Sequence, residues 1–187
     1  MHIRAADLAD VENILALDHS YLTDHVWQMN GQAGSRQTSS REAIGEYATT
    51  FRLARLPGQL QAPYPHDAKT LRRILHRCDY VWVALGDSAS DLLAYIGLAL
   101  VPWQNTGWIP CLAVAPALRR RGMASQLLKT ATAQARSDGL HSVTIDVQTK
   151  NYPATRFCQT QGFRFAGYSD NYYSSSDIAL FFAYRTR

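Results

Sequence analysis

The stretch CLAVAPALRRRGMA, from Cys111 to Ala124, decides how the chain is organised. It begins inside a short apolar run, Ile109 to Val114, that stops just before Pro116. Such a run is typical of a buried strand, because proline cannot continue a ladder of backbone hydrogen bonds. Apolar residues then recur at intervals of three and four, which gives a helix one apolar face. The stretch therefore predicts a strand, a basic turn and a helix from Arg120 to about Ser137.

The turn between the strand and the helix is suited to holding an anion. The first turn of a helix leaves backbone N–H groups without partners and is the positive end of the helix dipole. A glycine there lets a phosphate approach the backbone, and arginine side chains pair with phosphate oxygens. The structural alternative is a solvated basic turn that only begins a surface helix. The predicted anion site comprises Arg119, Arg120, Arg121, Gly122, Met123 and Ala124.

The motif RRRGMA at 119–124 resembles the Q/R-x-x-G-x-G/A signature of the GNAT family of N-acetyltransferases. The later segments NYPATRF at 151–157 and QGF at 161–163 resemble the family's N-x-x-A-x-x-F-Y and G-F elements, in the same order. The resemblance covers about half of the chain, roughly residues 91–187. It implies acetyl-CoA as cofactor, with its pyrophosphate on the backbone of the turn. It also implies an α/β GNAT fold, in which a mixed central sheet of six to seven strands is flanked by helices.

Length and composition are consistent with this. A chain of 187 residues is long enough for one domain, 1–187, with a core that needs no disulfide or metal. No apolar run approaches the roughly 20 residues of a membrane span, and the first residues do not show the long apolar segment and cleavage site expected of a signal peptide. The three cysteines are far apart, and the basic residues outside the turn are scattered. We expect a cytoplasmic monomer or homodimer that binds a small-molecule amine, without a metal site and without nucleic-acid or membrane partners.

The remaining patterns predict strands at 2–5, 80–85, 92–101, 142–147, 163–168 and 178–184, and helices at 7–17, 67–77 and 153–160. Residues 19–66 are harder to interpret and form a candidate insert at the substrate site. Asp24 to Met29 alternates as a strand does, and Tyr47 to Leu56 reads as a second strand that Pro57-Gly58 ends. The two strands would form a hairpin over the acceptor site. Apolar residues at helical spacing in Arg41 to Arg55 leave a helical insert as the alternative.

The resemblance also implies which residues contact the cofactor arm. It assigns to Leu112, Ala113 and Val114 the exposed strand edge that pairs with the pantetheine, and their side chains are otherwise ordinary core. Asn151 matches a family asparagine that contacts the arm, although its position before Pro153 also suits a helix N-cap. Ala154 is small at a point where the cofactor passes close to the helix.

Two residues are candidates for catalysis. Cys158 stands where many relatives have the tyrosine that protonates the departing thiolate. A thiol can donate a proton, but a small buried cysteine is the structural alternative. Asp146, between Ile145 and Val147 in an apolar strand, needs a site or a hydrogen-bonded partner to be there, and it could bind the amine or act as base through water. Other tyrosines could replace the missing acid: Tyr152, Tyr168, Tyr172, Tyr173 and Tyr184.

A narrower resemblance concerns the acceptor. The segments at 24–29, 145–148 and 177–182 are similar to those of the streptothricin acetyltransferase group. This similarity implies direct acetyl transfer to a primary amine of a small molecule such as an antibiotic. A protein or peptide N-acetyltransferase and a non-catalytic acyl-CoA sensor are the alternatives. Aromatic walls around an acidic pocket would favour a small amine, and a wide groove beside the sheet would favour a peptide.

Overall fold

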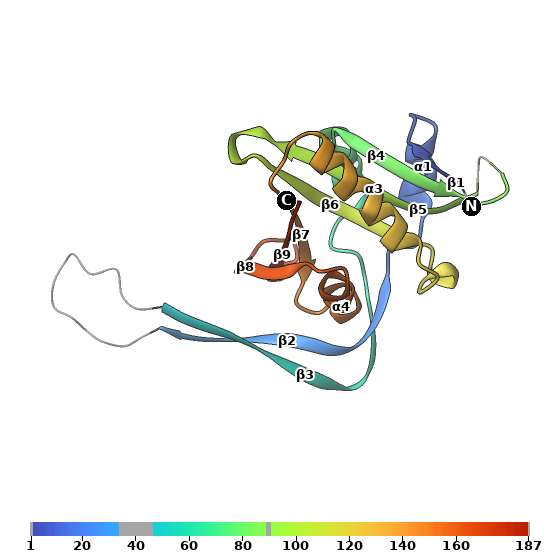
Figure 1. Cartoon of the computed structure of the whole chain (residues 1–187). Coiled ribbons are helices and arrows are strands. Elements are labelled where there is room, and N and C mark those ends of the chain that lie inside the picture. The colour runs from blue at the N-terminus through green and yellow to red at the C-terminus, as the bar shows by residue number, and fades with distance from the viewer. Residues whose placement is uncertain (1, 34–46, 89–90, 187) are drawn as a thin grey trace.

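The computed structural model describes residues 2–33, 47–88 and 91–186. Within these ranges, seven strands form one sheet in the order β1-β4-β5-β6-β7-β9-β8 (Figure 1). Strands β6 and β7 are parallel neighbours, and the other neighbouring strands of the sheet are antiparallel. The strands are β1 (His2–Ala5), β4 (Tyr80–Leu85), β5 (Leu92–Val101), β6 (Thr106–Val114), β7 (Ser142–Gln148), β8 (Arg164–Ser169) and β9 (Ala179–Arg185).

Helices cover both faces of this sheet. Helices α1 (Asp10–Ala16) and α2 (Ala68–Arg77) pack on one face, and α3 (Met123–Ser137) and α4 (Tyr152–Thr160) pack on the other. Two 3-10 turns, η1 (Pro102–Gln104) and η2 (Pro116–Leu118), flank β6. Within the described ranges, no helix is both long and apolar enough to cross a membrane. The predicted mixed sheet of six to seven strands flanked by helices is confirmed.

Helix α3 begins three residues later than the sequence predicts, at Met123 rather than Arg120. Arg120 has φ +64° and Gly122 has φ +86°, so both lie in the left-handed region that a right-handed helix excludes. The predicted C-terminal end is confirmed, because Gly139 with φ +75° follows the last turn of the helix. The arginine turn is therefore a separate loop between η2 and α3.

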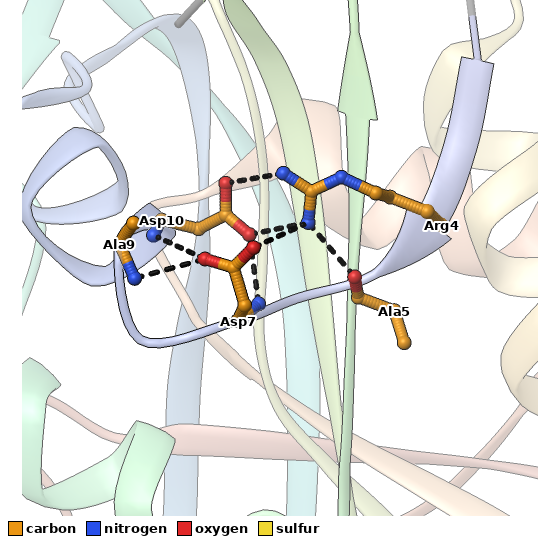
Figure 2. A network of polar contacts seen from close by, with 5 residues as sticks. All are labelled: Arg4, Ala5, Asp7, Ala9 and Asp10. Atoms are coloured by element: carbon orange, nitrogen blue, oxygen red, sulfur yellow. Dashed lines mark hydrogen bonds and ion pairs between the residues drawn. The ribbon is translucent and has the colours of Figure 1, made fainter. Parts of the chain in front are cut away.

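A buried ion pair fixes the corner between β1 and α1 (Figure 2). The Arg4 guanidinium donates to both carboxylate oxygens of Asp10, at 2.6 and 2.9 Å, and Asp10 is only 2% exposed. Burial alone would raise the pKa of Asp10, but the hydrogen bonds from Arg4 and from the Asp7 amide outweigh it and lower the pKa. The Asp7 carboxylate accepts from the Ala9 and Asp10 amides, which are the capping contacts expected of Asp7, although α1 itself spans Asp10–Ala16 rather than the predicted 7–17.

Residues before α2 form a long hairpin, β2 (Tyr21–Ala33) with β3 (Tyr47–Ala62), outside the main sheet (Figure 1). The predicted hairpin is confirmed, and the helical alternative is wrong for 47–55; residues 41–46 lie outside the described ranges. The prediction that Pro57-Gly58 ends the strand is also wrong. Thr23 pairs with Leu60 and His25 with Arg55, so residues 56–59 bulge opposite Asp24. A bulge accommodates proline and glycine, because its residues need not follow the ladder.

The hairpin is attached to the N-terminal end of α4. The Trp27 amide donates to the Thr149 carbonyl at 2.9 Å, and the Trp27 indole donates to the Thr155 hydroxyl at 3.2 Å. The His25 ring packs on the Tyr152 ring with 4.8 Å between centroids. These contacts hold β2 alongside α4, and farther along the hairpin an aromatic ring of β3 packs on two aromatic rings of β8.

Candidate active site

The central feature of the site is a split between β6 and β7. Their parallel pairing runs from Thr106 with Ser142 to Ile109 with Ile145. Beyond that point β6 stays with β5 as far as Val114, and β7 stays with β9 as far as Gln148. A bulge in β6 accompanies the divergence, since Cys111 pairs with Gly97 and Trp108 with Ala99. The two strands therefore separate at Pro110, a residue without an N–H group.

The split exposes backbone groups on one edge of β6. The Ala115 amide donates to the Leu93 carbonyl at 2.8 Å and so points toward β5. Because backbone groups alternate along a strand, those of Val114 and Leu112 point the other way, into the split. The Val114 carbonyl accordingly accepts a hydrogen bond from Arg119 Nε at 3.0 Å. Ala113 lies on the same strand, but by this alternation its own N–H and C=O face β5.

The turn before α3 presents its backbone to solvent. A Cβ built on Gly122 would meet no atom within 4 Å, so the space above this residue is open. The Gly122 carbonyl accepts the Gln126 amide at 3.1 Å, which leaves the N–H groups of the first helical turn, from Met123 and Ala124 onward, without partners in the helix. Arg120 and Arg121 are exposed. The turn is thus an open helix N-terminus with positive charge around it.

The Arg119 side chain is turned back toward β6. Its Nε bonds the Val114 carbonyl, and its Nη2 donates to the Asp18 carbonyl at 3.3 Å. The guanidinium therefore ties the turn to the open strand edge and to the segment after α1. Of the three arginines, Arg120 and Arg121 are the ones whose side chains face solvent.

A cavity of about 100 Å³ lies in the split. Its walls come from β6, β7, α4, the loop after β3 and the loop between β8 and β9. Five residues predicted from the sequence are brought together there: Leu112, Asp146, Asn151, Ala154 and Cys158. Among the described residues that line the cavity, none belongs to the turn at 119–124. The predicted site residues therefore form two groups, one at the turn and one at the cavity, with the open edge of β6 between them.

The sequence model of the acetyltransferase (GNAT) family matches residues 47–163. The chain belongs to the GNAT acetyltransferase family. Members of this family are N-acetyltransferases that use acetyl-CoA, and so is this protein. No curated protein sequence matches the chain.

Solved structures share the fold of this acetyltransferase. A nourseothricin acetyltransferase superposes with a TM-score of 0.80 at 24% identity, over 100% of this chain and 98% of its own. A second structure, from Bacillus anthracis str. Ames, is assigned as a streptothricin acetyltransferase and was solved with acetyl coenzyme A. It superposes with a TM-score of 0.72 at 17% identity, over 98% of both chains. The ribosomal-protein-S18-alanine N-acetyltransferase from Escherichia coli superposes with a TM-score of 0.63 at 15% identity, over 99% of this chain and 93% of its own. At these identities the likeness concerns the fold alone.

Asp146 is the central charged group of the cavity in this acetyltransferase. One carboxylate oxygen accepts the Trp108 indole N–H at 2.7 Å, and the other accepts the Tyr173 hydroxyl at 2.8 Å. Burial raises the pKa of Asp146, and these two hydrogen bonds oppose the rise. An acidic residue in an apolar strand was expected to have a site or a hydrogen-bonded partner, and Asp146 has both a cavity and two partners. A carboxylate in so poorly solvated a place attracts a cation strongly.

The structure distinguishes among the five tyrosines considered as proton donors. Tyr173 is 5% exposed and lines the cavity. The other four do not line it and have contacts elsewhere: Tyr152 with His25, Tyr168 with Thr49, Tyr172 with Phe181, and Tyr184 with Phe163. The Tyr173 hydroxyl already donates to Asp146, and burial raises its pKa well above the ordinary range. It holds the carboxylate in place and is a poor acid.

Cys158 and Asn151 both have structural roles on α4. Cys158 is 1% exposed, and burial raises the pKa of its thiol to about 12, so proton donation to a thiolate of ordinary pKa near 8.5 is uphill. The Asn151 Oδ1 accepts the Ala154 amide at 3.1 Å, which confirms the N-cap. Asn151 and Ala154 nevertheless line the cavity.

Sequence reasoning missed several residues of the cavity. Trp108 reaches Asp146 from 38 positions away, through the parallel register of β6 and β7. Tyr64 and His66 come from the segment PYPHD at 63–67, which lies between β3 and α2. Two prolines around a tyrosine and a histidine indicate an ordered loop, but no local signal shows that this loop lines the same cavity as residues of β7.

Proposed function

We propose that this acetyltransferase moves the acetyl group of acetyl-CoA directly to a primary amine of a small cationic molecule, such as an antibiotic. The observation that carries the proposal is the Asp146 carboxylate in an aromatic-walled cavity at the β6–β7 split. Its aromatic walls are Tyr64, His66, Phe157 and Tyr173. A small acidic cavity of about 100 Å³ with aromatic walls suits a small ammonium ion, whereas an extended peptide needs a long groove. The likeness to a nourseothricin acetyltransferase supports the same acceptor class.

The residues fit acetyl-CoA along the line from the turn to the cavity. The N–H groups at Gly122, Met123 and Ala124 would bind the diphosphate, helped by the charges of Arg120 and Arg121. The left-handed Gly122, with open space above it, leaves room for this ligand. On the edge at 112–114, the backbone groups of Leu112 and Val114 would pair with the amides of the arm, while those of Ala113 face β5 and Arg119 positions the edge. Asn151 and Ala154 line the end nearest the chemistry. The bound cofactor supplies an acetyl thioester.

The protein contributes orientation and charge to the reaction. Asp146 holds the ammonium group of the acceptor, and Trp108 and Tyr173 fix the carboxylate in one orientation. Removal of water from around this ion pair strengthens it, because the effective dielectric constant is lower in the cavity than in water. A nitrogen held beside the thioester carbonyl reacts as in an intramolecular reaction.

Transfer without an acetylated enzyme is supported by the state of the thiols. The two cysteines that line the cavity are Cys111 and Cys158, both buried. A hydrogen bond with Cys78, followed by burial, raises the pKa of Cys111, and burial raises that of Cys158 to about 12. Neither is a thiolate at neutral pH, and the thiolate is the nucleophilic form of cysteine.

The insert at 19–66 covers the acceptor side in this proposal. Tyr64, Pro65 and His66 at its end line the cavity. Tyr21, at the start of β2, donates through its hydroxyl to the Gln148 side chain at 3.0 Å, and Gln148 is a lining residue too. Both ends of the hairpin therefore meet at the cavity, and the insert supplies acceptor selectivity.

The test is acetyl transfer from acetyl-CoA, followed by product mass, across streptothricin, aminoglycosides, polyamines, amino acids and short peptides. We expect one added acetyl group on a small polyamine-like or antibiotic acceptor. Preferential acetylation of the peptides would contradict the small-molecule assignment. Tight acetyl-CoA binding without transfer to any member of the panel would support the sensor alternative instead.

A further inference from the structure

The imidazole ring of His66 lies at the proposed acceptor side of the cavity, and aromatic rings orient it. It lines the cavity between the Tyr64 ring, with 5.3 Å between centroids, and the Tyr173 ring, at 5.7 Å. Across the described residues, neither ring nitrogen of His66 has a hydrogen-bond partner. Packing alone therefore holds the ring, and its nitrogens are available to a ligand or to water.

The backbone around His66 is held in place on both sides. Asp67 is the N-cap of α2, and its carboxylate accepts the Thr70 amide at 2.7 Å. On the other side, the Pro65 carbonyl accepts the Ser174 hydroxyl at 3.5 Å, which links this loop to the loop that carries Tyr173. The Tyr64 ring packs against His19 with 4.9 Å between centroids. A side chain on such a support keeps its position during a reaction.

We propose that His66 is the base that removes a proton from the acceptor ammonium while Asp146 binds that ammonium. This inference rests on the proposed function. One N–H bond of the ammonium breaks, its proton joins an imidazole nitrogen of His66, and the freed electron pair forms the new C–N bond to the thioester carbonyl carbon. The C–S bond then breaks, the sulfur takes its electron pair together with the second proton of the amine, and the products are the acetamide and CoA thiol. His66 is only partly buried and returns its proton to water.

The charges near His66 favour the imidazole as the base and Asp146 as the group that binds the ammonium. Burial lowers the pKa of His66 from its ordinary value of 6.5, and the negative charge of Asp67 opposes that shift. The hydroxyls of Tyr64 and Tyr173 are neutral, because burial raises the pKa of both. The Asp146 charge lies behind the Tyr173 hydroxyl. The imidazole is therefore neutral near pH 7 and can accept a proton, whereas both Asp146 oxygens already accept hydrogen bonds.

The experiment compares kcat/KM against pH for the unaltered protein, His66→Gln and His76→Gln, with the acceptor found in the panel. His76 is an exposed histidine on α2 outside the cavity and serves as the matched control. We expect the unaltered protein and His76→Gln to lose about tenfold per pH unit below the pKa of His66. His66→Gln should lose on the order of 10²-fold near neutral pH, with unchanged CoA affinity. Its remaining activity should rise with pH as the fraction of free amine rises.

A second variant, His66→Ala, tests the inference by restoration of activity. His66→Ala leaves room for a small base, so added imidazole should restore part of its rate and should not stimulate Asp146→Asn. If His66→Gln keeps both the kcat/KM of the unaltered protein and its loss of activity at low pH, the inference is overturned while the proposed function stands. A loss of CoA affinity in proportion to the lost rate overturns it as well. Failure of the unaltered protein to acetylate any acceptor overturns the proposed function, and this inference with it.

Discussion

The turn before α3 and the cavity at the β6–β7 split are built in different ways. The turn and the neighbouring strand edge use the backbone of one continuous segment, 112–124. The cavity uses side chains from separate segments, with His66 before α2, Trp108 on β6, Asp146 on β7 and Tyr173 between β8 and β9. A backbone-built site depends on local conformation, whereas a side-chain-built site depends on the register of distant segments. Changes at the turn should therefore abolish cofactor binding, and changes at the cavity should alter acceptor chemistry while cofactor binding remains.

The largest effect is expected at the turn. Gly122→Arg should reduce CoA affinity by more than about 100-fold, or about 2.7 kcal/mol. The new side chain would project into the open space above the turn, where the diphosphate is proposed to lie, without meeting another protein atom within 4 Å of its Cβ. Calorimetric titration with CoA measures the loss. Unchanged affinity would remove the diphosphate from this turn.

The other end of α3 offers a matched control for this variant. Gly139 has φ +75°, and a Cβ built on it also meets no atom within 4 Å. Gly139→Arg should therefore lower thermal stability by a similar amount, on the order of 1 kcal/mol for a left-handed residue, while CoA affinity stays the same. Equal losses of affinity in both variants would mean that backbone strain, rather than the site, is responsible.

Local patterns predicted the elements whose boundaries depend on local chemistry. Strands β4 and β5 have the predicted bounds, because apolar runs and a polar turn define both ends. The continuation of β3 beyond Pro57-Gly58 could not be predicted, since it depends on a bulge set by pairing with β2. The start of α3 at Met123 was missed because two left-handed residues, Arg120 and Gly122, precede it. Arginine gives no sequence signal for that conformation.

The same distinction explains what could be predicted of the site. The turn at 119–124 was predicted as one motif, because its proposed role in binding the diphosphate depends on contiguous backbone. Asp146 was predicted because a lone acid in an apolar strand is unusual. Its partner Trp108 and the neighbouring His66 were missed, since only the strand register and the path of the insert bring them to the cavity. A long-range arrangement of this kind has no signature in one sequence.

At the cavity, Asp146→Asn should lower kcat/KM for a cationic acceptor by on the order of 10²-fold, as expected for loss of a charged hydrogen bond of about 1.5–3 kcal/mol. CoA affinity should not change, because the carboxylate is proposed to bind the acceptor and not the cofactor. Steady-state kinetics measures the effect on the acceptor, and calorimetry on the same preparation measures the affinity for CoA. Equal acceptor kinetics would remove Asp146 from the site.

The stability of Asp146→Asn relative to the unaltered protein should increase as pH rises. Because burial raises the pKa of Asp146 above its unfolded value, the folded state binds this proton more tightly than the unfolded state does. The unaltered protein therefore loses stability as pH rises from the unfolded pKa through the folded pKa, and Asp146→Asn lacks that loss. Urea unfolding at several pH values from about 4 to 8 should show the variant gaining stability relative to the unaltered protein. A constant difference across that range would mean that the carboxylate is not perturbed.

The smallest effect is expected at Cys158. Cys158→Ala should change turnover by less than about tenfold, because a thiol with a pKa of about 12 is a poor donor to a departing thiolate. Cys111→Ala is the matched control, since Cys111 is another buried thiol that lines the same cavity. Similar small changes in both variants would reflect packing around the cavity. A loss on the order of 10²-fold in Cys158→Ala alone would make Cys158 the proton donor, and the acceptor half would then include a group that replaces the family tyrosine. Turnover at saturating acetyl-CoA distinguishes these outcomes, because neither thiol lies at the turn that is proposed to bind the diphosphate.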